Sequence, residues 1–318
     1  MPRWLTYTLL TMLLWGGWGV VSKPLADKLS PWQMQTLSAL GLLPVIGFLL
    51  FSRNFRSGPN PKRGFWLAFA SGVIASLGNV AYYQALGAGG KAADVTPLTA
   101  LYPVVTIVLA VLFLRERLNG VQGIGIALSL VAMYFFNVGA DSGWLTPWLL
   151  VTLIPIGLWG VAALLQKCAA NQASSEMATA AFLFGGLPIS LLSPLFFSMS
   201  WNLGLATCGL ALAVGLLFGF GNLTLIFAYG LGGKASVVTP MAGLYSLVTI
   251  PLAVLILGEK VSGREGLAIG LALGAAIALS CENPAPPSGS SPPAKRNGGV
   301  ADGIRTRNIQ NHNLGLYH

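Results

Sequence analysis

The sequence predicts an all-α polytopic membrane protein with ten transmembrane helices, arranged as two inverted five-helix repeats and followed by a disordered C-terminal tail. Three observations predict this fold. Of the 318 residues, 54% are hydrophobic and only 8% are charged, whereas soluble proteins carry about 25% charged residues. Charged residues divide the chain into long apolar stretches. Residues 70–128 also recur, without a gap, as residues 213–271.

The apolar stretches give the number of helices, because a transmembrane helix needs roughly 20 apolar residues. The stretches are residues 3–23, 28–53, 63–91, 94–115, 117–141, 141–167, 176–234, 234–259 and 265–282. The stretch 176–234 is long enough for two helices, and we expect it to fold back around residues 200–202. The first stretch has no convincing cleavage site, so we interpret it as a retained helix rather than a signal peptide.

Basic residues between the stretches predict the orientation. An even number of spans places both termini on one side of the membrane. A cytoplasmic N-terminus puts seven Lys and Arg residues of the first half inside and three outside, as the positive-inside rule requires. We therefore expect both termini in the cytoplasm and the protein in the plasma membrane, the inner membrane of a bacterium. The Pro/Ser-rich composition that begins at residue 283 predicts a disordered tail over residues 282–318.

The internal repeat predicts two domains, residues 4–138 and residues 144–281. A shift of 143 residues gives 28 identities over 59 positions, and a shift of 144 superimposes Trp15-Gly16 on Trp159-Gly160. Each half holds five predicted helices, an odd number, so the second half must cross the membrane in the opposite sense. Inverted repeats are typical of transporters that alternate access around a central site.

Motifs within the repeat resemble a known family. Residues 101–125 and 244–268, the latter with Leu257-Gly-Glu-Lys, are similar to the end of an EamA domain of the drug/metabolite transporter superfamily. Trp15-Gly16 and Trp159-Gly160 are similar to its first-helix signature. The resemblance covers about residues 5–281, and it implies two inverted EamA domains that transport small metabolites. Ser246 stands where the first copy has Pro103, so we expect a weaker kink there.

Other function classes find little support in the sequence. Both histidines lie in the last seven residues, and Asp94 is the one carboxylate near a span. We therefore expect no enzyme activity, catalytic residue, metal or cofactor. The predicted function is secondary transport, in the export direction, of a small metabolite, amino acid or drug-like solute across the inner membrane. The alternatives are an exchanger for anionic or phosphorylated metabolites and a non-transporting membrane scaffold.

The expected partners are a small-molecule substrate and the lipid bilayer. The Lys and Arg residues that produce the net charge of +9 lie between the apolar stretches and in the tail. The charge therefore does not indicate nucleic-acid binding. The protein is expected to be a monomer or a homodimer. Gly266, Gly270 and Gly274 form a stripe on one predicted helix, which we expect to pack within the bundle.

Polar and aromatic residues inside the spans are candidates for the substrate cavity. The amides need hydrogen-bond partners when buried, so interhelical bonds are the alternative for them. Aromatic residues near helix ends also form interfacial belts. The candidates are Trp15, Trp159, Asn79, Tyr82, Gln84, Asn222, Thr96, Pro97, Tyr102, Thr239, Pro240 and Tyr245.

The two Thr-Pro pairs allow two structures. In one, Thr caps a helix and Pro occupies its first position. In the other, the helix starts near Ala92 and Pro lies one turn inside it, where it frees a backbone carbonyl. Either structure marks mobile helices at the seam between the halves.

Lys91, Asp94 and Lys234 are candidates for gating or coupling. The lysines could attract an anionic substrate or extend toward lipid headgroups. Asp94, which the second half replaces with Val237, could carry a proton between the two sides; the alternatives are a helix cap and an ion pair with Lys91. Glu116 and Glu259 are expected to pair with basic neighbours at the surface.

Overall fold

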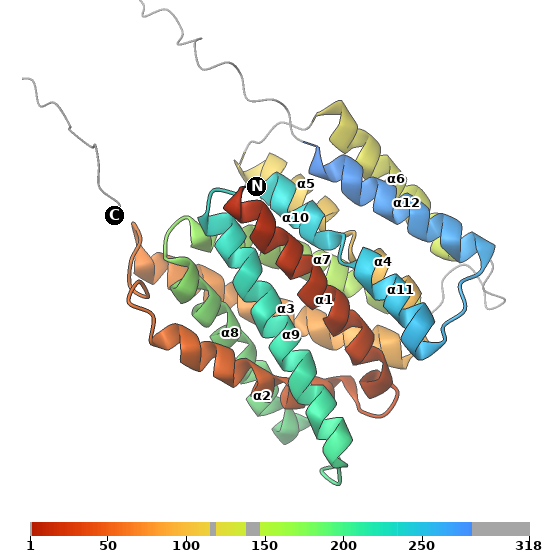
Figure 1. Cartoon of the computed structure of the whole chain (residues 1–318), viewed down its shortest axis with the longest axis horizontal. Coiled ribbons are helices and arrows are strands. Elements are labelled where there is room, and N and C mark those ends of the chain that lie inside the picture. Colours follow the sequence, from red (N-terminus) through yellow and green to blue (C-terminus); the bar gives the residue numbers. More distant parts are fainter. Residues whose placement is uncertain (1, 115–118, 138–146, 234, 282–318) are drawn as a thin grey trace, which may run out of the picture. The chain divides into compact units, whose positions relative to one another are not determined.

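A computed structural model describes residues 2–114, 119–137, 147–233 and 235–281, and every regular element in these ranges is an α-helix (Figure 1). The helices of the first half are α1 (Arg3–Ala26), α2 (Pro31–Leu50), α3 (Pro61–Gly87), α4 (Ala92–Thr99), α5 (Tyr102–Leu114) and α6 (Gly120–Asn137). Those of the second half are α7 (Pro147–Ala170), α8 (Ser175–Phe196), α9 (Leu205–Gly230), α10 (Ala235–Gly243), α11 (Ser246–Leu257) and α12 (Gly263–Ser280).

Each apolar stretch of the sequence contains helix. The stretch 176–234 folds back between Phe196 and Leu205, which confirms the predicted turn. Eight segments are long and apolar enough to cross a membrane, judged by length and composition, and the pairs α4–α5 and α10–α11 each count as one of them. In α6 the apolar part is shorter, Gly120–Ala132. The predicted tail, residues 282–318, lies outside the described residues.

Two predicted helices are broken in the middle. The stretch 94–115 divides into α4 and α5, and the stretch 234–259 divides into α10 and α11. Pro97 and Pro240 lie inside α4 and α10, so the second of the two Thr-Pro structures is correct. The helix also breaks in the second half, between Gly243 and Ser246, although Ser246 stands there in place of Pro103. The residue at this position therefore does not decide whether the helix breaks.

Close packing between the two halves depends on glycine. At Gly72 of α3, an added Cβ would collide with the Phe182 carbonyl of α8, and at Gly215 of α9 it would collide with the Ser38 carbonyl of α2. A residue with a side chain could not sit at either crossing. The same repeat positions of the two halves thus make equivalent crossings, α3 on α8 and α9 on α2.

Hydroxyl groups join the halves in the same paired way. Thr106 Oγ1 donates to the Gly160 carbonyl at 2.9 Å, and Thr249 Oγ1 donates to the Gly16 carbonyl at 3.0 Å. Thr106 and Thr249 are equivalent in the sequence repeat, as are Gly160 and Gly16. These bonds satisfy polar groups that the surrounding apolar helices could not.

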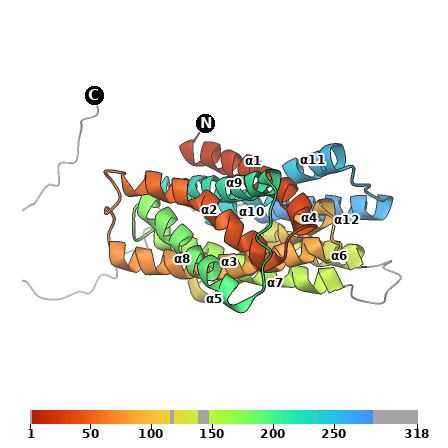
Figure 2. The ribbon, with the colours of Figure 1, turned by 90° about the horizontal axis from the view of Figure 1, so that it is seen from below.

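The helix pair α6–α12 lies at one edge of the bundle, side by side in both views (Figures 1 and 2). The glycine stripe of α12 does not pack tightly within the bundle. A Cβ at Gly266 or Gly270 would meet nothing within 4 Å, and one at Gly274 would meet only Leu128 at 3.9 Å. The expectation for this stripe is therefore wrong, because α12 presents its alanine positions, such as Ala268 and Ala275, to the core.

Large apolar side chains cover the outside of the bundle. Leu205 is 90% exposed, Leu255 79%, Phe196 76% and Phe48 73%. Polar residues such as Thr106 and Asn222 are buried instead. An arrangement that exposes apolar residues and buries polar ones is stable in lipid rather than in water.

Candidate functional site

A pocket between the two halves is the candidate site. Residues from α1, α3, α7, α8 and α9 line it, together with Tyr102 of α5 and Tyr245 before α11. Its empty space is about 470 Å³, including the part open to the outside. The lining residues are Trp15, Trp18, Ala75, Tyr102, Trp159, Ala162, Ala163, Gln166, Phe182, Phe218, Asn222 and Tyr245. None of these side chains is charged.

Two equivalent aromatic pairs form part of the lining. The Trp15 ring meets the Tyr245 ring edge-on, with centroids 6.0 Å apart. The Trp159 ring meets the Tyr102 ring in the same way, with centroids 6.2 Å apart. Each pair joins the first helix of one half to the broken helix of the other half. The structure thus brings together five of the predicted cavity residues: Trp15, Trp159, Asn222, Tyr102 and Tyr245.

The two predicted asparagines have different surroundings. Asn79 Oδ1 accepts a hydrogen bond from Trp159 Nε1 at 3.2 Å, and Asn79 is not part of the lining. Asn222 lines the pocket; its Oδ1 accepts from Gln166 Nε2 at 3.0 Å, and its Nδ2 donates to the Phe218 carbonyl at 2.9 Å. Both amides therefore make interhelical or intrahelical bonds, and only Asn222 also borders the pocket.

Seven other predicted residues lie away from the lining or behind it. The Tyr82 hydroxyl is 3.2 Å from Thr96 Oγ1, and the Tyr229 hydroxyl is 2.7 Å from Thr239 Oγ1. These bonds hold each Thr-Pro helix against the preceding long helix. Gln84 is exposed. The residues outside the lining are Asn79, Tyr82, Gln84, Thr96, Pro97, Thr239 and Pro240.

Sequence reasoning did not commit to seven lining residues: Trp18, Ala75, Ala162, Ala163, Gln166, Phe182 and Phe218. One signal in the sequence could have found some of them. A shift of 144 places Trp18 on Ala162 and Ser22 on Gln166, and a shift of 143 places Ala75 on Phe218. These are positions at which the two copies differ strongly in size or polarity.

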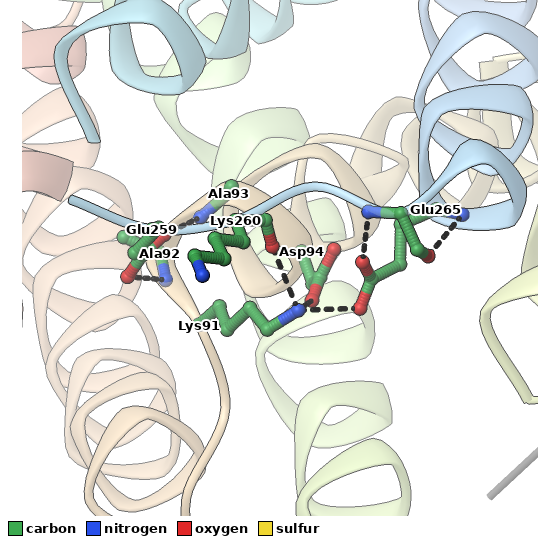
Figure 3. A network of polar contacts seen from close by, with 8 residues as sticks. Lys91, Ala92, Ala93, Asp94, Glu259, Lys260 and Glu265 are labelled. Carbon is green, nitrogen blue, oxygen red and sulfur yellow. Dashed lines mark hydrogen bonds and ion pairs between the residues drawn. The ribbon is translucent and has the colours of Figure 1, made fainter. Parts of the chain in front are cut away.

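A network of charged residues joins the start of α4 to the start of α12 (Figure 3). Lys91 Nζ lies 2.7 Å from Glu265 Oε1 and 3.9 Å from Asp94 Oδ2, and it donates to the Lys260 carbonyl at 3.0 Å. Glu265 is itself held by a capping box, since its Oε2 accepts from the Ser262 N–H at 2.7 Å. The predicted gate lysine is therefore engaged by the other half.

Glu259 caps a helix of the opposite half (Figure 3). Its Oε1 accepts from the Ala92 N–H at 2.9 Å, and its Oε2 accepts from the Ala93 N–H at 2.8 Å. A carboxylate at a helix N-terminus satisfies free N–H groups and interacts favourably with the helix dipole. The expected surface pairing of Glu259 with bases is therefore wrong. Glu116 and Lys234 lie outside the described residues.

Asp94 lies in the first turn of α4, and Lys91 occupies the cap position without a side-chain cap bond. The Asp94 side chain is 6% exposed, and its Oδ1 has no hydrogen-bond partner in the described part of the chain. Asp94 therefore does not cap α4, and its contact with Lys91 is long. Across the described ranges, no group of three His, Cys, Asp or Glu side chains is placed to hold a metal ion.

Comparison with known proteins identifies a family model that matches the first half of the chain. Residues 2–138 match the model of the EamA-like transporter family. The first half of the chain is an EamA domain. This confirms, for the first half, the resemblance that the motifs predicted. Together with the eight long apolar segments, it indicates a multi-pass membrane protein.

Two further proteins are similar to this chain. An uncharacterised protein of Methanocaldococcus jannaschii is 28% identical over 130 residues, which cover 41% of this chain and 93% of that protein. A solved structure, described only as "Crystal structure of protein", has a TM-score of 0.62 at 18% identity and covers 86% of this chain and 94% of its own. The second similarity shows that the fold is shared over most of both halves of the chain.

Proposed function

We propose that the protein is a secondary transporter that moves a small solute across the membrane by alternating access. The observation that supports this most strongly is a pocket lined by equivalent residues of both halves, Trp15 with Tyr245 and Trp159 with Tyr102. A site shared by two repeats can open to either side when one repeat rocks against the other.

The proposed architecture has ten crossings, with residues 4–138 and 144–281 as inverted repeats. It adds α6 and α12 to the eight segments that are long and apolar enough. The paired crossings of Gly72 and Gly215 support it, since equivalent contacts in both directions follow from a two-fold relation between the halves. Both termini are proposed to be cytoplasmic, in a bacterial inner membrane, and the proposed direction is export.

Labelling tests this topology. Single cysteines placed at Ser57 and at Asn202, in the loops before α3 and before α9, should differ in reactivity toward a membrane-impermeant maleimide in intact cells. The proposed topology puts both loops in defined compartments, cytoplasmic for Ser57 and external for Asn202. Equal labelling of both positions in intact cells would contradict it.

The alternative exchanger for anionic metabolites finds less support. Binding a phosphate or carboxylate needs a positive charge, and the lining holds no charged side chain. Lys91 is engaged by Glu265 at 2.7 Å. A non-transporting scaffold would have no use for a pocket shared by both halves.

The test is solute flux into proteoliposomes. Purified full-length protein is first screened for solutes that raise its melting temperature, because a ligand that binds the folded state stabilises it. Each stabilising solute is then tested for counterflow in proteoliposomes. The Ala162→Leu variant, which adds bulk to the pocket lining, should lose flux. The Leu150→Phe variant on the exposed face of the same helix should keep it. Stabilisation by solutes without any counterflow would contradict transport.

A further inference from the structure

The two equivalent tryptophans of the pocket differ in hydrogen bonding. Trp159 Nε1 donates to Asn79 Oδ1 and to the Ala75 carbonyl, both at 3.2 Å. Trp15 Nε1 is shielded from solvent and finds no acceptor among the described residues. The repeat equivalent of Asn79 is Asn222, which lines the pocket beside Trp15.

Gln166 explains why Asn222 does not accept a hydrogen bond from Trp15 Nε1. Its Nε2 donates to Asn222 Oδ1 at 3.0 Å, and Asn222 Nδ2 donates to the Phe218 carbonyl, so both ends of the amide are engaged. The first half has Ser22 at the position of Gln166. Ser22 bonds to the Trp18 carbonyl of its own helix at 2.7 Å, which leaves Asn79 free for Trp159.

The two equivalent tyrosines, Tyr102 and Tyr245, also differ in hydrogen bonding. The Tyr245 hydroxyl lies 3.2 Å from Thr99 Oγ1. The Tyr102 hydroxyl is buried and has no partner within the described ranges. The repeat equivalent of Thr99 is Ala242, which has no hydroxyl. A second difference between the copies therefore removes the partner of a second polar group in the same pocket.

These two groups are both donors. An indole N–H can only donate, and a phenol hydroxyl can donate. Buried polar groups without partners are rare and costly, so two in one pocket indicate a ligand that completes their hydrogen bonds. The Nε1 of Trp18, also in the lining, is likewise without a partner among the described residues, but Ala162 replaces it in the second half and offers no comparison.

The rest of the lining indicates the body of that ligand. Trp18, Phe182 and Phe218 present flat apolar rings, and no lining residue is charged. Aromatic side chains favour flat apolar partners through stacked and edge contacts. An anion or cation would lose its hydration here without a countercharge.

We propose that the pocket binds an uncharged, flat, apolar solute with a carbonyl-type acceptor that takes hydrogen bonds from Trp15 Nε1 and the Tyr102 hydroxyl. This inference rests on the proposed transport function and names its substrate class.

The test compares three probes of one shape: benzamide, benzoate and toluene. Their binding to the full-length protein in detergent is measured by equilibrium dialysis of the radiolabelled compounds. Benzamide should bind most tightly. Tyr102→Phe should weaken benzamide about three- to tenfold, the range for one hydrogen bond, and leave toluene unchanged. The control Tyr229→Phe, at a buried tyrosine outside the lining whose hydroxyl is bonded to Thr239, should change benzamide binding less than twofold.

Two further variants keep the test decisive. Trp15→Phe should weaken benzamide as Tyr102→Phe does. Ala242→Thr, which offers Tyr102 the partner that Thr99 gives Tyr245, should weaken it as well. Unchanged toluene binding shows that the pocket of a variant has kept its shape. The proposal is overturned if benzamide does not bind, if benzoate binds more tightly, or if Tyr102→Phe leaves benzamide binding unaltered.

This test separates the substrate class from transport. Binding in detergent does not require flux. Benzamide binding that depends on Tyr102, without counterflow in proteoliposomes, would support the ligand class and contradict the transporter. Counterflow of a solute that is indifferent to Tyr102→Phe and Trp15→Phe would support the transporter and overturn the ligand class.

Discussion

Lys91 Nζ lies 2.7 Å from Glu265 Oε1, and this ion pair connects the first half of the chain to the second. Partial burial by itself would lower the pKa of Lys91. The hydrogen bond to Glu265 and the charges of Asp94, Glu265 and Glu259 outweigh burial and raise this pKa above its ordinary value of 10.5. The folded protein therefore holds the Lys91 proton more tightly than the unfolded chain does.

The raised pKa of Lys91 predicts a loss of stability at alkaline pH. Its contribution is complete below the ordinary value of 10.5 and is lost as the pH rises through the higher folded value. Because the pair is partly exposed, the contribution is about 1 kcal/mol or less. Melting temperatures between pH 9 and 11.5 should therefore fall more steeply for the parent than for Lys91→Arg, which keeps its charge. Parallel curves for the parent and Lys91→Arg would contradict this, and Lys260→Arg serves as the control.

The cap that Glu259 gives α4 predicts an effect on stability. Glu259→Gln removes the charge and leaves one oxygen to serve the two N–H groups of Ala92 and Ala93. The expected loss is about 1–2 kcal/mol, measured as a lower melting temperature in detergent. Lys260→Gln is the control, because the structure gives a bond only to its carbonyl. If Glu259→Gln and Lys260→Gln have the same melting temperature, the cap contributes nothing to stability.

The glycine crossings predict strong steric effects. Gly72→Ala places a Cβ against the Phe182 carbonyl, and overpacking at such a contact costs about 1–3 kcal/mol. Gly47→Ala is a matched control, since its Cβ meets nothing within 4 Å, and it should leave stability unchanged or raise it by about 0.5–1 kcal/mol. Chemical unfolding followed by gel filtration measures both. A stable Gly72→Ala variant would mean that the helices are farther apart than described.

We expect Asp94 to couple transport to the movement of protons. Its side chain is 6% exposed, and the second half has Val237 at this position, so only the first copy of the repeat has the acid. Asp94→Asn should abolish accumulation driven by a pH gradient in proteoliposomes while keeping counterflow. Asp27→Asn, which removes an exposed partner of Lys23, should keep both. Accumulation by Asp94→Asn at the parent level would exclude Asp94 as the coupling acid.

The tail is expected to be dispensable. Its sequence changes from an apolar repeat to a Pro/Ser-rich segment after Glu282. A chain that ends at Glu282 should insert, purify as a single species and transport at the parent rate. Loss of folding in detergent after this truncation would show that the tail has a structural role.

Local sequence patterns were sufficient for the helices. The length of each apolar stretch and the charges between the stretches are properties of the chain itself, and the fold-back near residues 200–202 followed from them. The motifs at Trp15-Gly16 and at residues 101–125 were likewise sufficient for the EamA resemblance of the first half. The break between α4 and α5 could not be predicted from Pro103. The second half has Ser246 at the equivalent position, and its helix breaks as well.

The pocket depended on packing that the sequence does not state. Gln84 is nine residues after Ala75, the residue of α3 that lines the pocket. At about 100° per residue, Gln84 points to the opposite side of α3, so helix geometry could have excluded it. Trp18, Gln166 and Phe182 required knowledge of which helices meet. Glu259 was misjudged because its partners, the N–H groups of Ala92 and Ala93, come from the other half.

The cap by Glu259 also has a consequence for biosynthesis. Ala92 and its acceptor Glu259 are 167 positions apart in the chain. At ribosomal speeds of about 5–20 residues per second, that separation of 167 positions corresponds to a delay of about 8 to 33 seconds. During this interval the newly made start of α4 must leave its N–H groups to water or to the insertion machinery. The first half therefore completes its folding only after nearly the whole second half has been translated.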